Sequence, residues 1–397
     1  MLTNNAILKG IAFFFSLFVF LPYIAIVPTG TDTQPNALLA ASLLLLLFLA
    51  ITRFRMTFTW PIACIILIFA YSVIISLSLN SIGIRSIMGY ASVSIIALAS
   101  YHVFNRGLFT HLTIRIAAFT WFFFGAVQMF FNPEFGSQLM TRASGSSFAG
   151  RGVVSLAPEP SYYGIVCVFM LLVIQMLMSV NSMDKKQGRR YQLFLSLQIL
   201  LLAQSFTAVT LVLVYYVSNL MVRLSVKNVF RISLSVTIAG AIVMHFFATS
   251  RMGRLLGIIL THPFEIMRRD QSASERLVDI FASFYGFYES LPFSFGHGTS
   301  SYLDFMATHS DIFPTFDLAL TSNKIMSGYG SALFELGYMG ILLILAVLYA
   351  FWQTKNREYQ AVGLFLTAVM FSAIPPSFPL FGFMIGMAEW NRLSKRA

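Results

Sequence analysis

The chain has 397 residues, of which 57% are hydrophobic and 10% are charged, and its mean hydropathy is +0.78. This composition excludes a soluble globular protein, whose core could not hide so much apolar surface, and predicts an all-α protein that lies in a lipid bilayer. The net charge of +11 reflects membrane topology, as argued below, so we expect no nucleic-acid partner.

Candidate transmembrane helices follow from the rule that about 17 to 25 apolar residues cross the hydrocarbon core of a membrane. The rule predicts a polytopic protein with about twelve spans in a single membrane domain, residues 1–397. The spans lie near residues 8–28, 37–52, 58–79, 86–104, 112–131, 161–181, 193–204, 206–222, 229–249, 328–352, 359–374 and 378–391. No cleavage site of small residues follows the first span, so we expect it to be retained and not removed as a signal peptide.

The seventh and eighth spans are separated by a short polar stretch, Ala203-Gln-Ser-Phe-Thr207. The stretch contains neither glycine nor proline, which most tight turns require. We therefore expect a broken helix or a tightly paired hairpin at this point instead of two ordinary crossings.

The distribution of basic residues predicts the orientation of the chain. If the N-terminus is cytoplasmic, the inner side holds 17 of the 26 basic residues and only 3 of the 15 acidic ones. Because basic loops remain in the cytoplasm, this bias places both termini there. Two long segments, residues 132–161 and residues 250–327, then face the other side.

The first of these segments ends in Arg151-Gly-Val-Val-Ser-Leu-Ala-Pro-Glu-Pro-Ser-Tyr-Tyr-Gly164. Here Glu159 stands between two prolines, whose fixed φ holds it at the entrance of a predicted helix. Arg142 and Arg151 belong to the same loop. A carboxylate held at a membrane interface beside arginines predicts a site for a charged substrate.

The second segment contains a predicted amphipathic helix. Ser272 and Glu275 have the spacing of a capping box at its start. Apolar residues then recur on one helical face, at Leu277, Ile280, Phe281, Phe284 and Tyr288. We expect this helix on the outer membrane surface or under a lid. Arg276 falls in its first turn, which favours either an anion such as phosphate or a solvated surface arginine.

Three more ionisable residues in or just after this segment are candidates, namely His297, His309 and Glu335. His297 lies between two glycines, which allow either a tight turn or the approach of a ligand. His309 and Asp311 have no further ligand at metal-binding spacing, so we expect no metal site. Glu335 lies about two turns into a predicted helix, where a charge costs about 2.5 kcal/mol or more without a polar cavity or a partner. It is either buried with an outer arginine or catalytic.

Taken in chain order, these segments share a pattern with a known family. They are Arg151 with Pro158-Glu-Pro-Ser-Tyr-Tyr-Gly164, Gln204-Ser-Phe-Thr207, Ser272-Ala-Ser-Glu-Arg276, Gly296-His-Gly298 and Glu335-Leu-Gly337. Their order and spacing resemble those of Wzy-type O-antigen, capsule and exopolysaccharide repeat-unit polymerases. The related O-antigen ligases share this plan but usually carry a histidine near the end of the large loop. This chain has Thr321-Ser-Asn-Lys324 there.

The resemblance implies a membrane-embedded glycosyltransferase of GT-C-like architecture that uses neither a metal nor another cofactor. It would act at the periplasmic face of a bacterial inner membrane and join repeat units carried on undecaprenyl diphosphate. A chain-length regulator and a flippase are the implied protein partners. The reaction requires cations for the diphosphate and a base for the acceptor hydroxyl.

The resemblance also implies roles for individual residues. Glu159 is the first candidate for the base, followed by His309 and Glu335. The residues expected to bind substrate are Arg142, Arg151, Ser161, Tyr162, Ser272, Arg276 and His297. Two alternatives are a ligase of the same fold and a flippase or transporter of lipid-linked oligosaccharides. A transporter would place its charges near the bilayer midplane and show repeat symmetry.

Overall fold

The computed structural model describes residues 2–26, 33–51, 56–141, 152–223, 271–292, 294–309, 325, 327–372 and 374–394, with isolated residues between 230 and 261. This part of the chain is helical and contains no strand. The helices are α1 (Leu2–Phe20), α2 (Asn36–Ile51), α3 (Trp60–Ser78), α4 (Ile84–Asn105), α5 (Leu112–Phe130), η1 (Ser137–Leu139), α6 (Pro160–Ser179), α7 (Lys185–Leu197), η2 (Gln198–Ala203), α8 (Phe206–Val222), α12 (Gln271–Glu289), α13 (Tyr302–Thr308), α14 (Gly328–Leu336), α15 (Tyr338–Trp352), α16 (Arg357–Ser372) and α17 (Pro379–Ser394).

Four of these helices, α3, α4, α5 and α6, are long and apolar enough to cross a membrane. Most of α4 and α6 is buried by other helices, whereas only 39% of the apolar window of α3 or α5 is buried. The outer faces of α3 and α5 expose large apolar side chains such as Ile74 and Phe123. Apolar side chains on the outside of a helical bundle are characteristic of a membrane protein.

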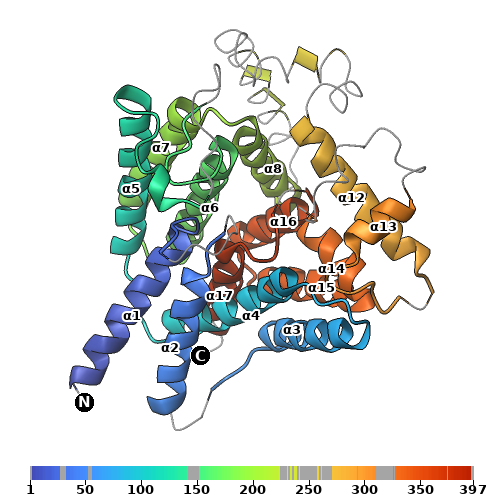
Figure 1. Ribbon diagram of the computed structural model, residues 1–397. Coiled ribbons are helices and arrows are strands. Elements are labelled where there is room, and N and C mark those ends of the chain that lie inside the picture. Colours follow the sequence, from blue (N-terminus) through green and yellow to red (C-terminus); the bar gives the residue numbers. More distant parts are fainter. Residues whose placement is uncertain are drawn as a thin grey trace.

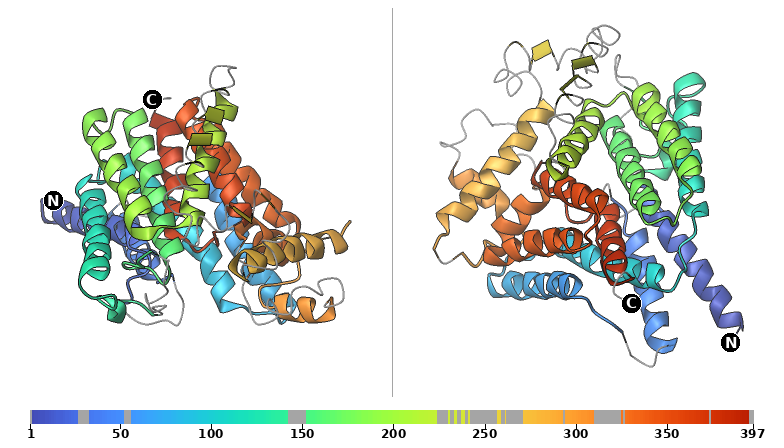
Figure 2. Two further views of the ribbon diagram at one scale, coloured as in Figure 1. Left: turned by 90° about the horizontal axis from the view of Figure 1, so that it is seen from above. Right: turned by 180° about the vertical axis from the view of Figure 1, so that it is seen from behind.

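The centre of the bundle is formed by α4 and α17, which pack along each other. Helices α5 to α8 lie on one side of this pair, and α12 to α14 lie on the other (Figures 1 and 2). Gly382 and Gly386 of α17 permit the close approach. A Cβ atom at Gly386 would lie 2.3 Å from the carbonyl oxygen of Ala97, so only glycine fits there.

Most helix boundaries agree with the predicted spans. α2 to α6 begin and end within about two residues of their predictions. The first helix is an exception, because α1 ends at Phe20 and not near residue 28. Pro22 stands two residues after this end, and proline excludes a continuing helix. The predicted span 229–249 falls almost entirely outside the described residues.

The predicted break between the seventh and eighth spans is confirmed. α7 continues into η2, a π-helical turn that ends at Ala203. Gln204 then adopts a left-handed conformation, with φ of 44° and ψ of 40°, which no helix can continue. The hydroxyl of Ser205 caps α8 by accepting from the N–H of Ala208 at 3.2 Å.

The predicted span 328–352 is wrong as a single helix, because it is broken at Gly337 into α14 and α15. Gly337 has a φ of +58°. A Cβ atom there would lie 2.2 Å from the carbonyl oxygen of Ser294. Packing of the 294–296 segment against this residue therefore requires the glycine and produces the break.

The amphipathic helix in the second long segment is confirmed as α12, whereas its expected place on the outer membrane surface or under a lid stays a prediction. Val278 and Ala282 are the buried residues that pack toward α13 and α14, whereas Phe281 and Tyr288 of the predicted apolar face are largely exposed. Small side chains suit the close packing with α14, so the aromatic residues are left outside. The helix begins at Gln271, one residue before the predicted cap Ser272.

Candidate functional site

A cavity of about 510 Å³ opens where the N-terminal ends of α2, α4 and α6 meet α13, α14 and the segment 374–378. We refer to this part of the molecule as the cavity end of the bundle. The volume lies in the range of about 300 to 1,000 Å³ that is usual for small-molecule sites. Its ionisable and aromatic lining includes Arg85, Tyr90, Tyr162, Tyr302 and Glu335. Segments far apart in the sequence therefore build one site.

Glu335 is the buried carboxylate of this cavity, with a relative exposure of 5%. Its Oε1 accepts a hydrogen bond from the hydroxyl of Ser86 at 2.8 Å, and its Oε2 accepts one from the phenol of Tyr90 at 2.7 Å. Both donors lie on α4, whereas Glu335 lies on α14. Among the described residues its side chain has no ion pair, so two neutral hydroxyls hold it in place.

The main chain of Glu335 is held as well. The turn at 296–298 packs on the end of α14, where the N–H of His297 donates to the carbonyl of Phe334 and that of Gly298 donates to the carbonyl of Glu335. Gly296 has a φ of +95°, and a Cβ atom there would lie 2.2 Å from the carbonyl oxygen of Glu335. The glycines of this turn thus serve a close backbone contact.

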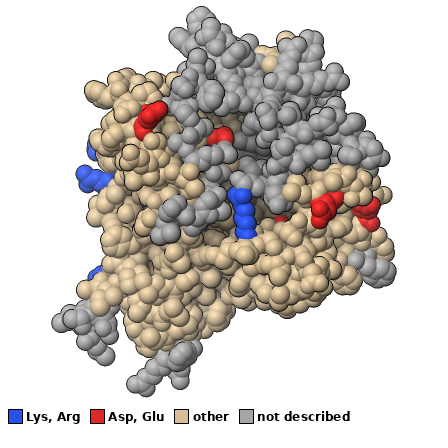
Figure 3. Space-filling model, viewed as in Figure 1, with Lys and Arg blue, Asp and Glu red and all other residues tan. Residues whose placement is uncertain are grey.

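A cation lines the same cavity as this carboxylate. Arg85 precedes Ser86 in the first turn of α4, lines the same cavity and is exposed. In the view of Figure 1, the space-filling representation shows few charged side chains on the described part of the surface, with a basic side chain beside a hollow near the centre (Figure 3). A guanidinium at a cavity can bind phosphate oxygens in a bidentate manner.

A second carboxylate, Asp279 of α12, is buried behind the cavity and accepts a hydrogen bond from the phenol of Tyr302 at 3.1 Å. Burial raises the pKa of Tyr302, and the charge of Asp279 raises that pKa further. The phenol therefore stays protonated and acts as a donor. This contact joins α12 to α13 at the edge of the cavity.

Of the predicted residues around Glu159 that the structure describes, Tyr162 lines the cavity and Ser161 does not. Glu159 caps the start of α6 through its carbonyl, which accepts from the N–H groups of Tyr162 and Tyr163. Its carboxylate accepts a hydrogen bond from the hydroxyl of Ser161 at 3.3 Å. Glu159 is partly exposed and stands one helical turn before Tyr162, outside the cavity lining.

The segment before Glu159 is packed inside the bundle, although it belongs to the predicted loop 132–161. Ser155 is fully buried. Its N–H donates to Oε1 of Gln128, and its hydroxyl donates to the carbonyl of Trp121. These bonds fix the approach of the chain to α6. Arg142 and Arg151 lie outside the described residues.

The two predicted histidines make structural contacts away from the cavity lining. The ring of His297 stacks on Phe334, and its Nε2 lies 3.0 Å from the carbonyl of Gly286. Nε2 of His309 lies 3.2 Å from the carboxylate of Glu289, at the end of α13. The side chains of Ser272 and Arg276 lie outside the described residues.

Sequence reasoning missed Arg85, Ser86 and Tyr90. They occupy the first two turns of α4, which the sequence presents as an apolar span with no recognisable motif. One signal was available, because Arg85 is a basic residue on the predicted outer side that belongs to neither long segment. A single cation at the entrance of a predicted helix is therefore a candidate for ligand binding, as a cation in a large loop is.

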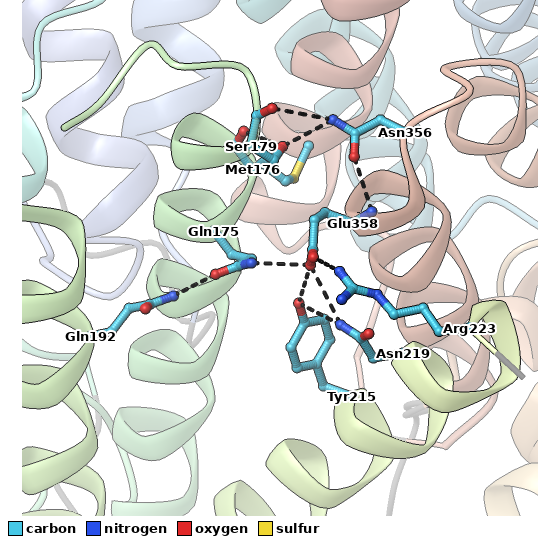
Figure 4. A network of polar contacts seen from close by, with 9 residues as sticks. All are labelled: Gln175, Met176, Ser179, Gln192, Tyr215, Asn219, Arg223, Asn356 and Glu358. Carbon is cyan, nitrogen blue, oxygen red and sulfur yellow. Dashed lines mark hydrogen bonds and ion pairs between the residues drawn. The ribbon is translucent and has the colours of Figure 1, made fainter. Parts of the chain in front are cut away.

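The opposite end of α6 carries another polar network. Glu358 of α16 forms an ion pair with Arg223 and accepts hydrogen bonds from Gln175, Tyr215 and Asn219 (Figure 4). Its donors come from α6 and α8, so this carboxylate joins three helices. It does not line the cavity.

Within the described part of the chain, no group of three or more His, Cys, Asp or Glu residues is arranged to hold a metal ion. The groups available for chemistry at the cavity are thus a carboxylate, a guanidinium and several hydroxyls. Comparison with models of known protein families finds no match for this chain, and comparison with curated proteins finds no similar sequence.

Proposed function

We propose that this protein is a glycosyltransferase that polymerises oligosaccharide repeat units carried on undecaprenyl diphosphate. The proposal includes an inner-membrane location, about twelve spans in a GT-C-like arrangement and a cavity end that faces the periplasm. The observation that carries it is the shared cavity of Glu335 and Arg85. A carboxylate and a guanidinium on one cavity match the two groups that the reaction needs.

The chemistry assigns a task to each group. The acceptor hydroxyl oxygen attacks the anomeric carbon of the donor sugar, the bond from that carbon to the diphosphate oxygen breaks, and its electron pair leaves with the diphosphate. Arg85 binds the diphosphate as negative charge develops on it. Glu335 takes the proton of the acceptor hydroxyl. Both substrates are lipid-linked, so a cavity at the end of apolar helices suits them.

The geometry favours Glu335 over the other two candidates for the base. Glu335 faces the cavity, and its carboxylate is held by two oriented donors. Glu159 stands outside the cavity lining, and His309 is engaged with Glu289. A base must reach the proton that it removes, so a place on the cavity wall is the first requirement.

The test is the surface glycan profile of a strain that lacks this protein. A polymerase predicts that long chains disappear while a single repeat unit is still transferred to its final acceptor. Loss of every transferred form would contradict the proposal and indicate a ligase or a flippase. Restoration of long chains by the wild-type protein is the control.

A further inference from the structure

We propose that Ser86 and Tyr90 are positioning residues that orient the carboxylate of Glu335, so that one end of α4 places both the diphosphate-binding cation and the base. This inference rests on the proposed function. Ser86 and Tyr90 are separated by one helical turn and therefore point to the same side of α4. Each donates to a different oxygen of Glu335, so the carboxylate can neither rotate nor tilt without losing a bond.

The hydroxyl of Ser86 is used differently from those of several other helical serines in this chain. Ser42, Ser94 and Ser218 donate to the carbonyl four residues earlier in their own helices. Ser86 is the third residue of α4, so no carbonyl of its own helix stands four residues before it. Its hydroxyl reaches instead to a residue 249 positions away in sequence.

Tyr90 supplies the second bond from a buried position. Its relative exposure is 1%, so the phenol would be costly to bury without an acceptor. The acceptor is Glu335, which is the one carboxylate among the described residues that line the cavity. Phenylalanine would fill the same space at a lower desolvation cost, which indicates that the hydroxyl is present for Glu335.

Thr299 sets the position of α4 from which these donors act. Its hydroxyl oxygen accepts from the N–H of Gly83 at 2.7 Å and lies 2.8 Å from the hydroxyl of Ser76, while its N–H donates to the carbonyl of Ser81. Thr299 directly follows Gly298, whose N–H holds the main chain of Glu335. A single short turn thus binds the start of α4 and the end of α14 together.

The arrangement fixes the separation of Arg85 from Glu335. Arg85 and Ser86 are adjacent in one helical turn, so a shift of α4 moves the cation and the carboxylate's donor together. Catalysis by positioned groups is sensitive to such geometry, since a misplacement of about 1 Å can cost about a hundredfold in rate. The hydroxyls of Ser86 and Tyr90 touch the carboxylate and not the substrate in this proposal.

The experiment uses the full-length protein in lipid nanodiscs and, as substrate, the lipid-linked repeat unit extracted from the deletion strain. Tyr90→Phe and Ser86→Ala are expected to lower kcat by about tenfold to a hundredfold while KM stays within about twofold. Ser86→Thr keeps the hydroxyl and should recover most of the activity. The matched control is Tyr163→Phe, which removes a buried phenol bond of 2.8 Å to Gln198 outside the cavity lining.

A purely structural role would lower the amount or thermal stability of the protein in Tyr90→Phe and Tyr163→Phe alike, without a selective effect on kcat. That result, or wild-type kcat in both Tyr90→Phe and Ser86→Ala, would overturn the inference while leaving the proposed function standing. If the wild-type protein forms no polymer from this substrate, the proposed function itself fails and the inference fails with it. An infrared difference spectrum against Glu335→Gln adds a direct check, because loss of either donor must shift the carboxylate band of Glu335.

Discussion

Two glutamates at opposite ends of the bundle show how differently one protein can accommodate a carboxylate. Glu358 is surrounded by Arg223 and by amide and phenol donors, all of which belong to the protein. Glu335 has two hydroxyl donors and faces a cavity. Along α6, from the cavity residue Tyr162 to Gln175 beside Glu358, the two sites are about 20 Å apart.

The difference lies in what satisfies the charge. At Glu358 a cation and several donors neutralise it within the fold, which is how buried ion pairs connect helices. At Glu335 the described residues supply orientation without neutralisation, and the cation Arg85 lines the cavity in which a substrate would lie. We therefore expect substitutions at Glu358 to affect stability and substitutions at Glu335 to affect activity.

The largest effect is expected for Glu335→Gln. Glutamine has nearly the same shape and can still accept from Ser86, but it cannot take a proton from a sugar hydroxyl. Polymer formation should fall by at least about a hundredfold, within the range that a general base contributes. The measurement is chain length and rate with purified protein and lipid-linked repeat units, at an unchanged amount of protein in the membrane.

Polymers of wild-type length from Glu335→Gln would remove this residue from the mechanism. Glu159→Gln is the informative companion, because Glu159 was the first candidate from the sequence. If Glu159→Gln alone abolished polymer while the protein accumulated normally, the base would lie at the start of α6. Glu335 would then no longer be the catalytic carboxylate in the contrast with Glu358.

Arg85→Ala should have the next largest effect. Loss of the guanidinium is expected to lower kcat/KM for the lipid-linked donor by about tenfold to a hundredfold, in line with the strength of a charge-assisted bond. Arg85→Lys keeps the charge but loses the planar fork, so it should recover little. Wild-type kcat/KM in Arg85→Lys would show that Arg85 acts only as a general positive charge.

At the other end of α6, Glu358→Ala should reduce stability with little change in kcat. The substitution leaves Arg223, Asn219 and Gln175 without their shared acceptor. Because Arg223 is 39% exposed and reaches water, we expect a loss of about 1.5 kcal/mol, the lower end for bonds to a charged group. Thermal unfolding in detergent measures it, and Glu358→Gln, which retains an acceptor, should lose less.

The sequence alone predicted more of the helices than of the contacts around Glu335. Hydropathy located most of the described helices, the polar break at Gln204 was apparent, and Glu335 was one of three candidates for the base. The partners of Glu335 were not apparent, because apolar periodicity reports which residues avoid water and not which helices are neighbours. Ser86 meets Glu335 across 249 residues of sequence, and no local pattern encodes that contact.

The packing of α12 against its neighbours was not apparent from the sequence for a related reason. The recurring apolar residues of α12 include Phe281 and Tyr288, but this recurrence does not tell which residues of the helix contact its neighbours. Beside a membrane an aromatic side chain can remain outside, and close packing selects small residues such as Ala282 for the interior. The break at Gly337 was not apparent from the sequence either, because it depends on contact with the distant Ser294.

The smallest effect is expected for His309→Gln, which tests whether a third ionisable group takes part in catalysis besides Glu335 and Arg85. His309 lies at the end of α13 and pairs with Glu289, whose side chain is 46% exposed. A pair open to water contributes only about 0 to 1 kcal/mol. Because the ring is engaged away from the cavity lining, polymerisation should stay within about threefold of wild type, less than the about hundredfold or more expected of a lost base. The contrary result would be a loss of activity in His309→Gln as large as in Glu335→Gln, with normal thermal unfolding. It would show that α13 moves to bring the imidazole to the substrate. His309 and Glu335 together, and not Glu335 alone, would then have to be considered for the role of base.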